Sequence, residues 1–138
     1  MGEARPVAAP ARHRLFVLAH GRSGDKGDTV NIGVIARRPE WYPTLAAELP
    51  AARVAEYFRP FGAGPVDRFE LPNLWALNFV VRRALGGGGA LGLRLDAQGK
   101  TYAQALLRMP LELSDEIVRA AREHWGSRLP DDCVLPGR

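Results

Sequence analysis

Two adjoining stretches decide how this chain folds: His20-Gly21-Arg22-Ser23-Gly24-Asp25-Lys26-Gly27-Asp28, followed directly by Thr29-Val30-Asn31-Ile32-Gly33-Val34-Ile35-Ala36-Arg37. The first is polar and has a glycine at every third position, so its backbone can turn freely and pass close to a partner. The second alternates between apolar residues and polar or small ones, as a half-buried strand does. We therefore expect a polar loop at 21–28 between two strands, 14–20 and 29–37, and a loop held by a rigid scaffold commonly carries function.

The remaining sequence predicts a mixture of helices and strands. Helices are expected at 39–58, 73–86 and 114–125, and strands at 66–71, 91–95 and 103–113. The helix at 73–86 rests on Asn73 as an N-cap and on apolar residues at three-to-four spacing from Leu74 to Leu85. Because helices and strands do not alternate strictly, we expect an α+β fold with a mainly antiparallel sheet, covered on one face by the first two helices.

Two asparagines occupy informative positions in these elements. Asn78 falls on the apolar stripe of the expected helix, where an amide without partners costs about 1–3 kcal/mol. Loop 21–28 is its expected hydrogen-bonding neighbour. Asn31 lies on the non-core face of the second strand together with Gly33, where it faces a ligand or a partner subunit; an exposed polar strand face explains it equally well.

Composition restricts the class of partner. The chain has 138 residues, enough for one domain with a real core, and a formal net charge of +4 from 19 basic and 15 acidic residues. The arginines are spread singly rather than gathered in a stripe, so we expect no nucleic-acid partner. Arginine binds carboxylate and phosphate with two parallel hydrogen bonds, which favours an anionic small molecule as ligand. Solvated surface arginines are an equally good explanation for most of them.

Cysteine, histidine and hydropathy patterns exclude several further classes. Cys133 is the single cysteine, and His13, His20 and His124 lack the spacing of metal ligands, so we expect no disulfide framework, no metal site and no cofactor. No apolar run reaches membrane-spanning length, and the first residues do not resemble a signal peptide. We expect a cytoplasmic protein with no membrane partner.

The polar stretch is not a known phosphate-binding loop. A P-loop requires Gly-Lys-Ser/Thr at the start of a helix, whereas here Lys26 precedes Gly27 and a strand follows. A dinucleotide-binding fingerprint fails for the same reason. The remaining interpretation is an anion-binding loop in which glycine amides, charges and hydroxyls act together. Its expected ligand-binding residues are Arg22, Ser23, Lys26, Asn31 and Asn78.

Acid–base chemistry at this loop is a separate possibility. The candidate catalytic groups are Asp25, Asp28 and His20. The two carboxylates either hold the neighbouring cations in place, which is the commoner role, or act as base and acid. The sequence does not decide between these roles, and the catalytic residues stay unknown.

Longer motifs resemble a known family: Arg22-Ser23-Gly24-Asp25-Lys26-Gly27-Asp28 with Asn31-Ile32-Gly33-Val34, Leu77-Asn78-Phe79-Val80, Ala84-Leu85-Gly86-Gly87-Gly88, and Leu95-Asp96-Ala97-Gln98-Gly99-Lys100. They look like the AtuA-like ferredoxin-fold domain, the small C-terminal domain of the acyclic terpene utilisation family. The resemblance implies a ferredoxin-like α/β sandwich at 14–113, after a flexible tail at 1–13 and before a C-terminal helix and tail at 114–138. In that family the domain is usually fused behind a larger domain, and it also occurs as a separate small protein.

The resemblance also implies a pathway, since the family's genomic settings suggest degradation of branched acyl-CoA thioesters. Two functions follow. In one, the protein is a small subunit of an acyl-CoA-processing system, works with a larger AtuA-like chain and binds an anionic ligand such as an acyl-CoA at loop 21–28. In the other, it is a non-catalytic binding or assembly module whose polar loop is structural.

A homodimer is the expected state in isolation. A ferredoxin-like sheet carries its helices on one face, and the other face would then expose Phe16, Leu18 and Ile35. The alternative is that the helix at 114–125 folds back over this apolar patch.

Overall fold

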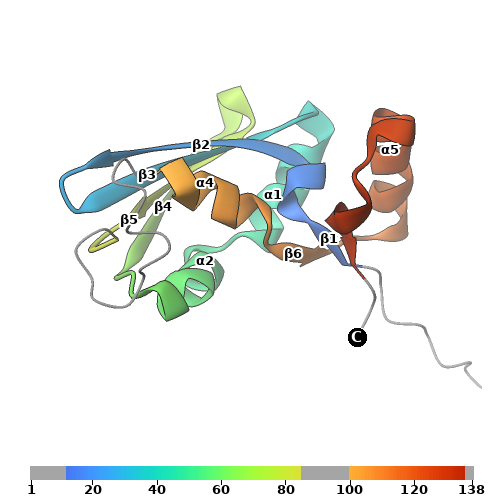
Figure 1. Cartoon of the computed structure of the whole chain (residues 1–138). Coiled ribbons are helices and arrows are strands. Elements are labelled where there is room, and N and C mark those ends of the chain that lie inside the picture. The colour runs from blue at the N-terminus through green and yellow to red at the C-terminus, as the bar shows by residue number, and fades with distance from the viewer. Residues whose placement is uncertain (1–11, 85–99, 136–138) are drawn as a thin grey trace, which may run out of the picture.

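The computed structural model describes residues 12–84 and 100–135, which form two antiparallel sheets with helices packed against them (Figure 1). The four-stranded sheet has the order β2-β3-β5-β4, with β2 at Ala19–Lys26, β3 at Thr29–Ala36, β5 at Ala76–Val81 and β4 at Val66–Leu71. The three-stranded sheet has the order β6-β1-β7, with β6 at Pro110–Glu112, β1 at Arg12–Arg14 and β7 at Val134–Leu135.

The α-helices are α1 (Tyr42–Glu48), α2 (Ala51–Phe58), α4 (Lys100–Leu107) and α5 (Asp115–Trp125). Short 3-10 helices lie at Leu15–Val17, Pro39–Trp41, Arg59–Phe61, Pro72–Leu74, Gly126–Arg128 and Asp131–Cys133. The α+β prediction is confirmed.

The polar stretch at 21–28 is a strand and not the loop that we expected. Residues 19–26 pair with 29–36 along their whole length, from Ala19 opposite Ala36 to Lys26 opposite Thr29. Only two residues turn the chain, and the first, Gly27, has a φ of 60°, which glycine adopts without a steric penalty. The closely spaced glycines do not break the strand, because β3 supplies its hydrogen bonds on one side.

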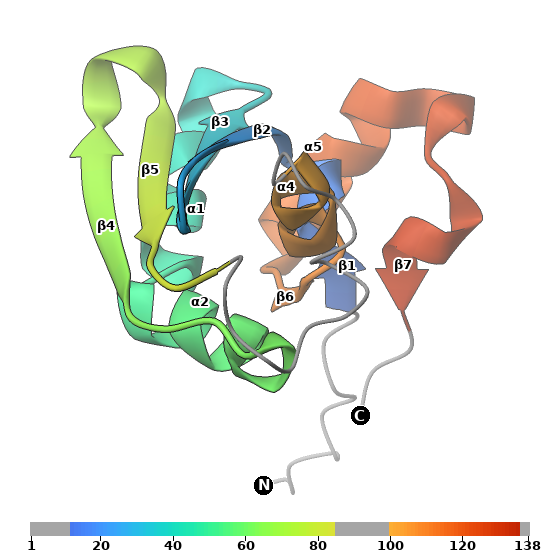
Figure 2. The ribbon, with the colours of Figure 1, turned by 60° about the vertical axis from the view of Figure 1, so that its left-hand side comes forward.

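Alternation in β3 sorts side chains between two faces of the sheet, as predicted. Its even-numbered residues, from Val30 to Ala36, are buried. Leu77, Phe79 and Val81 from β5 join them on the same face. The helices contact the sheet from this side: α1 contacts β3, α2 contacts β4, and α4 contacts β2 and β3 (Figure 2). We call this the core face, and the opposite side of the four-stranded sheet the open face.

Two residues of β2 hold α4 against the core face. A Cβ built on Gly21 would lie 3.2 Å from Cγ of Leu107, so this glycine leaves the space that the helix occupies. The Ser23 hydroxyl accepts a hydrogen bond from the backbone N–H of Ala103 at 3.0 Å, in the first turn of α4. The sequence signal at these two positions therefore reflects helix packing.

The expected helix at 73–86 is wrong: its centre is strand β5. Pro72–Leu74 forms one 3-10 turn, and β5 then pairs with both β3 and β4. Both faces of this strand are largely apolar, so the three-to-four spacing that we took as a helical stripe also fits a central strand. The helix covering the sheet beside α1 and α2 is α4, in a segment where the sequence suggested a strand.

Further boundaries also differ from the prediction. The strand expected at 14–20 is divided into β1, a 3-10 turn and the start of β2, and β1 begins at Arg12. Within 103–113 only Pro110–Glu112 is a strand. The segment after Pro130, expected to lack regular structure, contains β7. The strand expected at 91–95 and the glycine run at 86–89 lie outside the described residues.

The C-terminal helix is confirmed, and α5 is fixed to the sheet by Arg37. The Ser114 hydroxyl caps α5 by accepting from the N–H of Ile117 at 3.2 Å. The Arg37 guanidinium lies over both Phe16 and Trp125, 4.6 and 4.7 Å from their ring centroids, and the two rings contact each other at 5.3 Å. The indole N–H of Trp125 also donates to the Val17 carbonyl at 2.9 Å. Phe16 therefore packs against Trp125 of α5, and Leu18 is fully buried. The prediction that both residues are exposed on the uncovered face of the sheet is wrong.

A matched pair of glycine substitutions tests the packing of α4. Gly21→Val places a branched side chain against Leu107, and we expect it to lower the free energy of unfolding by about 1–3 kcal/mol. Gly24→Val is the control, because a Cβ at Gly24 has nothing within 4 Å. This change should be neutral or slightly stabilising, since valine suits a strand better than glycine. Urea unfolding measures both, and equal effects would contradict the packing role of Gly21.

Candidate functional site

The open face displays alternate residues of all four strands, arranged in rows by the strand register. One row is His20, Ile35, Ala76 and Leu71; the next is Arg22, Gly33, Asn78 and Phe69; the third is Gly24, Asn31, Val80 and Asp67. Lys26 and Thr29 complete the face beside the turn. The cationic side chains therefore gather along β2, and the apolar ones along β4 and the β4–β5 turn.

The apolar half of the open face is unusually exposed. Phe69, Leu71, Leu74 and Trp75 expose 51, 41, 62 and 44% of their surface. They adjoin a hollow of about 360 Å³ lined by Gly33, Ile35, Leu71, Leu74, Ala76, Leu77 and Asn78. Figure 1 shows the β4–β5 turn standing above β2 and β3. We call Phe69, Leu71, Leu74 and Trp75 the apolar corner.

Trp75 is held in a backbone conformation that a bulky residue rarely adopts. Its φ is 53°, in the left-handed region that favours glycine. Its carbonyl accepts from the N–H of Ala36 at 2.8 Å, and its own N–H donates to the Pro72 carbonyl at 3.1 Å. These two backbone bonds hold the turn in this conformation. Residues with such a backbone persist only where the surrounding structure holds them, and they are enriched at functional sites.

Asn31 and Asn78 form a polar pair at the centre of the face. The Asn78 side-chain amide donates to Oδ1 of Asn31 at 2.8 Å. Asn78 is half-buried on β5, and Asn31 is exposed on β3. The expectation that Asn78 bonds to residues 21–28 is therefore wrong, because its partner lies in β3. Gly33, in the same row as Asn78, leaves the sheet uncovered between this pair and Arg22.

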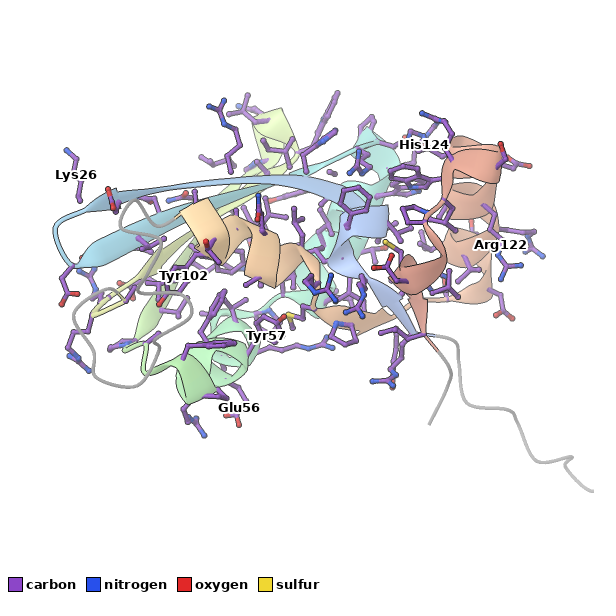
Figure 3. All side chains as sticks on the ribbon, viewed as in Figure 1. Lys26, Glu56, Tyr57, Tyr102, Arg122 and His124 are labelled. Atoms are coloured by element: carbon purple, nitrogen blue, oxygen red, sulfur yellow. The ribbon has the colours of Figure 1, made fainter. Side chains whose placement is uncertain are left out.

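The predicted site residues do not form one cluster. Arg22, Lys26, Asn31 and Asn78 share the open face with His20, whereas Ser23 and Asp25 lie on the core-face side of β2, and Asp28 is in the turn. The three acid–base candidates are therefore divided among the open face, the other face and the turn. Figure 3 shows Lys26 at the hairpin tip, far from His124 on α5. Among the described residues no group of histidines, cysteines and carboxylates has the arrangement of a metal site.

Two histidines near Arg37 have lowered pKa values. Partial burial lowers the pKa of His20 most, and the positive charges of Arg37 and His124 lower it further. Burial also lowers the pKa of His124 most, followed by the charges of Arg38, Arg37 and Arg128. The Arg37 guanidinium lies 3.5 Å from Nε2 of His20. Both histidines are therefore neutral near neutral pH.

A larger hollow of about 460 Å³ lies away from the open face, lined partly by Arg14, Leu107, Arg108 and Cys133. Arg14 donates there to the backbone carbonyls of Asp132 and Arg108, at 2.7 and 2.8 Å. These bonds connect β1 to the segments beside it. Since the cation is engaged in holding the fold together, we regard this hollow as structural and the open face as the candidate site.

Sequence reasoning missed the apolar corner. Phe69 and Leu71 lie in a correctly predicted strand, but their exposure depends on β4 being an edge strand with one uncovered face. Leu74 and Trp75 were assigned to a helix. Pro72-Asn73 was the signal that could have identified a turn here, because both residues are common in turns.

The fold and the site define a class: a small ferredoxin-like α+β sandwich whose four-stranded sheet has helices on one face and is uncovered on the other among the described residues. A family model for the AtuA ferredoxin-like domain matches residues 13–112. The chain therefore belongs to this family, and the resemblance and the ferredoxin-like fold are both confirmed. Searches of curated proteins and of solved structures find no match. No helix among the described residues is both long and apolar enough to cross a membrane.

The histidine pair predicts a loss of stability in mild acid. A histidine whose folded pKa is below its unfolded value contributes stability above that unfolded value, near 6.5, and loses the contribution as pH falls through the folded pKa. We expect the free energy of unfolding to fall between about pH 7.5 and 5.5. The double variant His20→Gln, His124→Gln should flatten this slope in urea titrations at each pH. An unchanged slope would assign the effect to other groups.

Proposed function

We propose that this domain is an assembly module that docks onto another protein chain through its open face. The observation that supports this proposal most is the apolar corner. More than two-fifths of the surface is exposed in each of its residues, Phe69, Leu71, Leu74 and Trp75. A contiguous apolar patch on a monomer commonly marks an interaction site. Aromatic residues and arginine supply most binding energy at protein interfaces. This face offers Phe69 and Arg22, and Trp75 is exposed in the adjoining β4–β5 turn.

The partner that we propose is a larger chain of an acyl-CoA-processing system. Membership of the AtuA ferredoxin-like family supports this choice, because the resemblance implies a domain that works beside a larger one. The exposed face supports it independently, because a covalent or non-covalent neighbour would cover the apolar corner. In this view the small chain contributes a docking surface, and the chemistry occurs on its partner.

The distribution of the acid–base candidates favours assembly over catalysis by this chain. General acid–base chemistry needs its groups within hydrogen-bond reach of one substrate. Asp25 and His20 project from opposite faces of β2, and Asp28 is in the turn. The polar residues of β2 therefore serve two purposes: Ser23 fixes α4, and Arg22 faces the proposed partner.

Binding of an anionic ligand is a second candidate function. Arg22 lies in the row of Gly33 and Asn78, which line the hollow of about 360 Å³. An acyl-CoA or a similar amphipathic anion could place its charge at Arg22 and its apolar part in the hollow. Titration with CoA or phosphate, followed by NMR, tests this reading. Shifts confined to residues around Arg22 and Gly33 at up to millimolar ligand would favour it.

Leu74→Ser tests the docking proposal. Leu74 is 62% exposed, so its loss should change the free energy of unfolding by no more than about 0.5 kcal/mol. Its removal from an interface should weaken binding by about 1–3 kcal/mol, roughly five- to 150-fold. The measurement is calorimetric titration of the full chain with the larger AtuA-family chain of the same genome.

Arg119→Ser is the matched control, because Arg119 is exposed on α5 and is not one of the residues in the rows of the open face. It should leave the affinity unchanged. Equal affinities for the native chain and the Leu74→Ser variant would contradict docking through the apolar corner, and so would a complete lack of binding.

A further inference from the structure

Charge is unevenly distributed over the open face. The single carboxylate among its rows, Asp67, is paired with Arg82 at 2.7 Å. Arg22 and Lys26 are exposed on β2 and have no ion-pair partner among the described residues. His20, on the same strand, is neutral near pH 7 because its pKa is lowered. Within the part of the chain that the structure describes, the positive charge of this β2 border is therefore not compensated by an ion pair.

A second copy of this chain is a poor match for that border. Two sheets that pack face to face with roughly aligned strands are related by a two-fold axis along or across the strands. An axis across the strands places β2 over β2 of the other copy and brings Arg22 and Lys26 of both copies together. An axis along the strands places β2 over β4 and presses the same cations onto Phe69 and Leu71. Either arrangement buries positive charge without a counter-charge, which is strongly unfavourable.

We infer that the open face is built for a different chain, whose contact surface has an apolar centre bordered on one side by carboxylates. The inference rests on the docking function proposed above and specifies the partner. Complementary charge of this kind speeds association and rejects surfaces of the wrong sign. The apolar corner supplies contact area, and the β2 border selects which apolar surface is accepted.

The spacing of the two features restricts the partner further. Arg22 lies directly opposite Gly33, on the neighbouring strand, and Gly33 lines the hollow. The β2 backbone at Arg22 and the Gly33 wall of the hollow are thus about one interstrand distance apart, roughly 5 Å. A partner fits when a large apolar side chain enters the hollow and a carboxylate on an adjacent residue or strand reaches Arg22. Gly33 has no side chain to separate the two.

Charge reversal on the border tests the inference with the full chain and the larger AtuA-family chain of the same genome. Arg22→Glu should weaken binding by about tenfold or more, and raising the salt concentration should weaken binding of the native chain. Arg122→Glu is the matched control, because Arg122 projects from the outer side of α5 (Figure 3). It should leave the affinity unchanged.

The failures of the two proposals are distinguishable. Binding that is lost in Leu74→Ser but insensitive to salt and to Arg22→Glu would support docking and overturn the charge inference. A homodimer of the native chain at low salt, dispersed by Leu74→Ser in light scattering, would also overturn it. So would binding to phosphatidylglycerol vesicles but not to phosphatidylcholine vesicles, since a lipid surface would then be the occupant. No binding of the larger chain to any form would overturn the docking function itself.

Discussion

The rest of the structure depends on the register of the β2–β3 hairpin. Side chains alternate between faces along a strand, so a shift of one residue would exchange every core residue of β3 with its exposed neighbour. The two-residue turn at Gly27 fixes the register, and the buried residues from Val30 to Ala36 make any other register costly. The same constraint aims Arg22 outward and Ser23 toward α4. A single turn thus determines which residues of the hairpin enter the core and which lie on the open face.

The two faces of this sheet meet different requirements with residues from the same short segments. On the core face, α4 packs closely against β2. Gly21 leaves room for Leu107, and Ser23 accepts a hydrogen bond from Ala103. On the open face, Gly33 keeps the surface low between a cationic border and an apolar corner. The stretch from Gly21 to Gly33 therefore combines residues that pack the core with residues that lie on the open face. Its glycines and charges need no common ligand to explain them.

Elements whose pattern is specified locally were predictable from sequence, whereas β5 and α4, which depend on packing with distant segments, were not. The alternation of β3 and the capped, amphipathic α5 are specified locally, by Val30 to Ala36 and by Ser114. The segment around Leu77 and Val81 is apolar throughout, so only pairing with β3 and β4 makes it a strand. The candidate site depends on that pairing, because the register brings Asn78 beside Asn31 and exposes Phe69. Local sequence identified the cations of β2 but gave no indication of the apolar surface that lies beside them.

The pairing of β1 with β7 has a mechanical consequence. Arg12, at the start of β1, lies opposite Leu135, at the end of β7, so both ends of the described chain emerge at one point. Force that pulls these ends apart acts across the strands and opens their few hydrogen bonds one after another. Such a contact yields before a sheet whose long strands are loaded together along their length. Tension on these two ends would therefore separate β7 from β1 first and leave the hairpins of the four-stranded sheet in register.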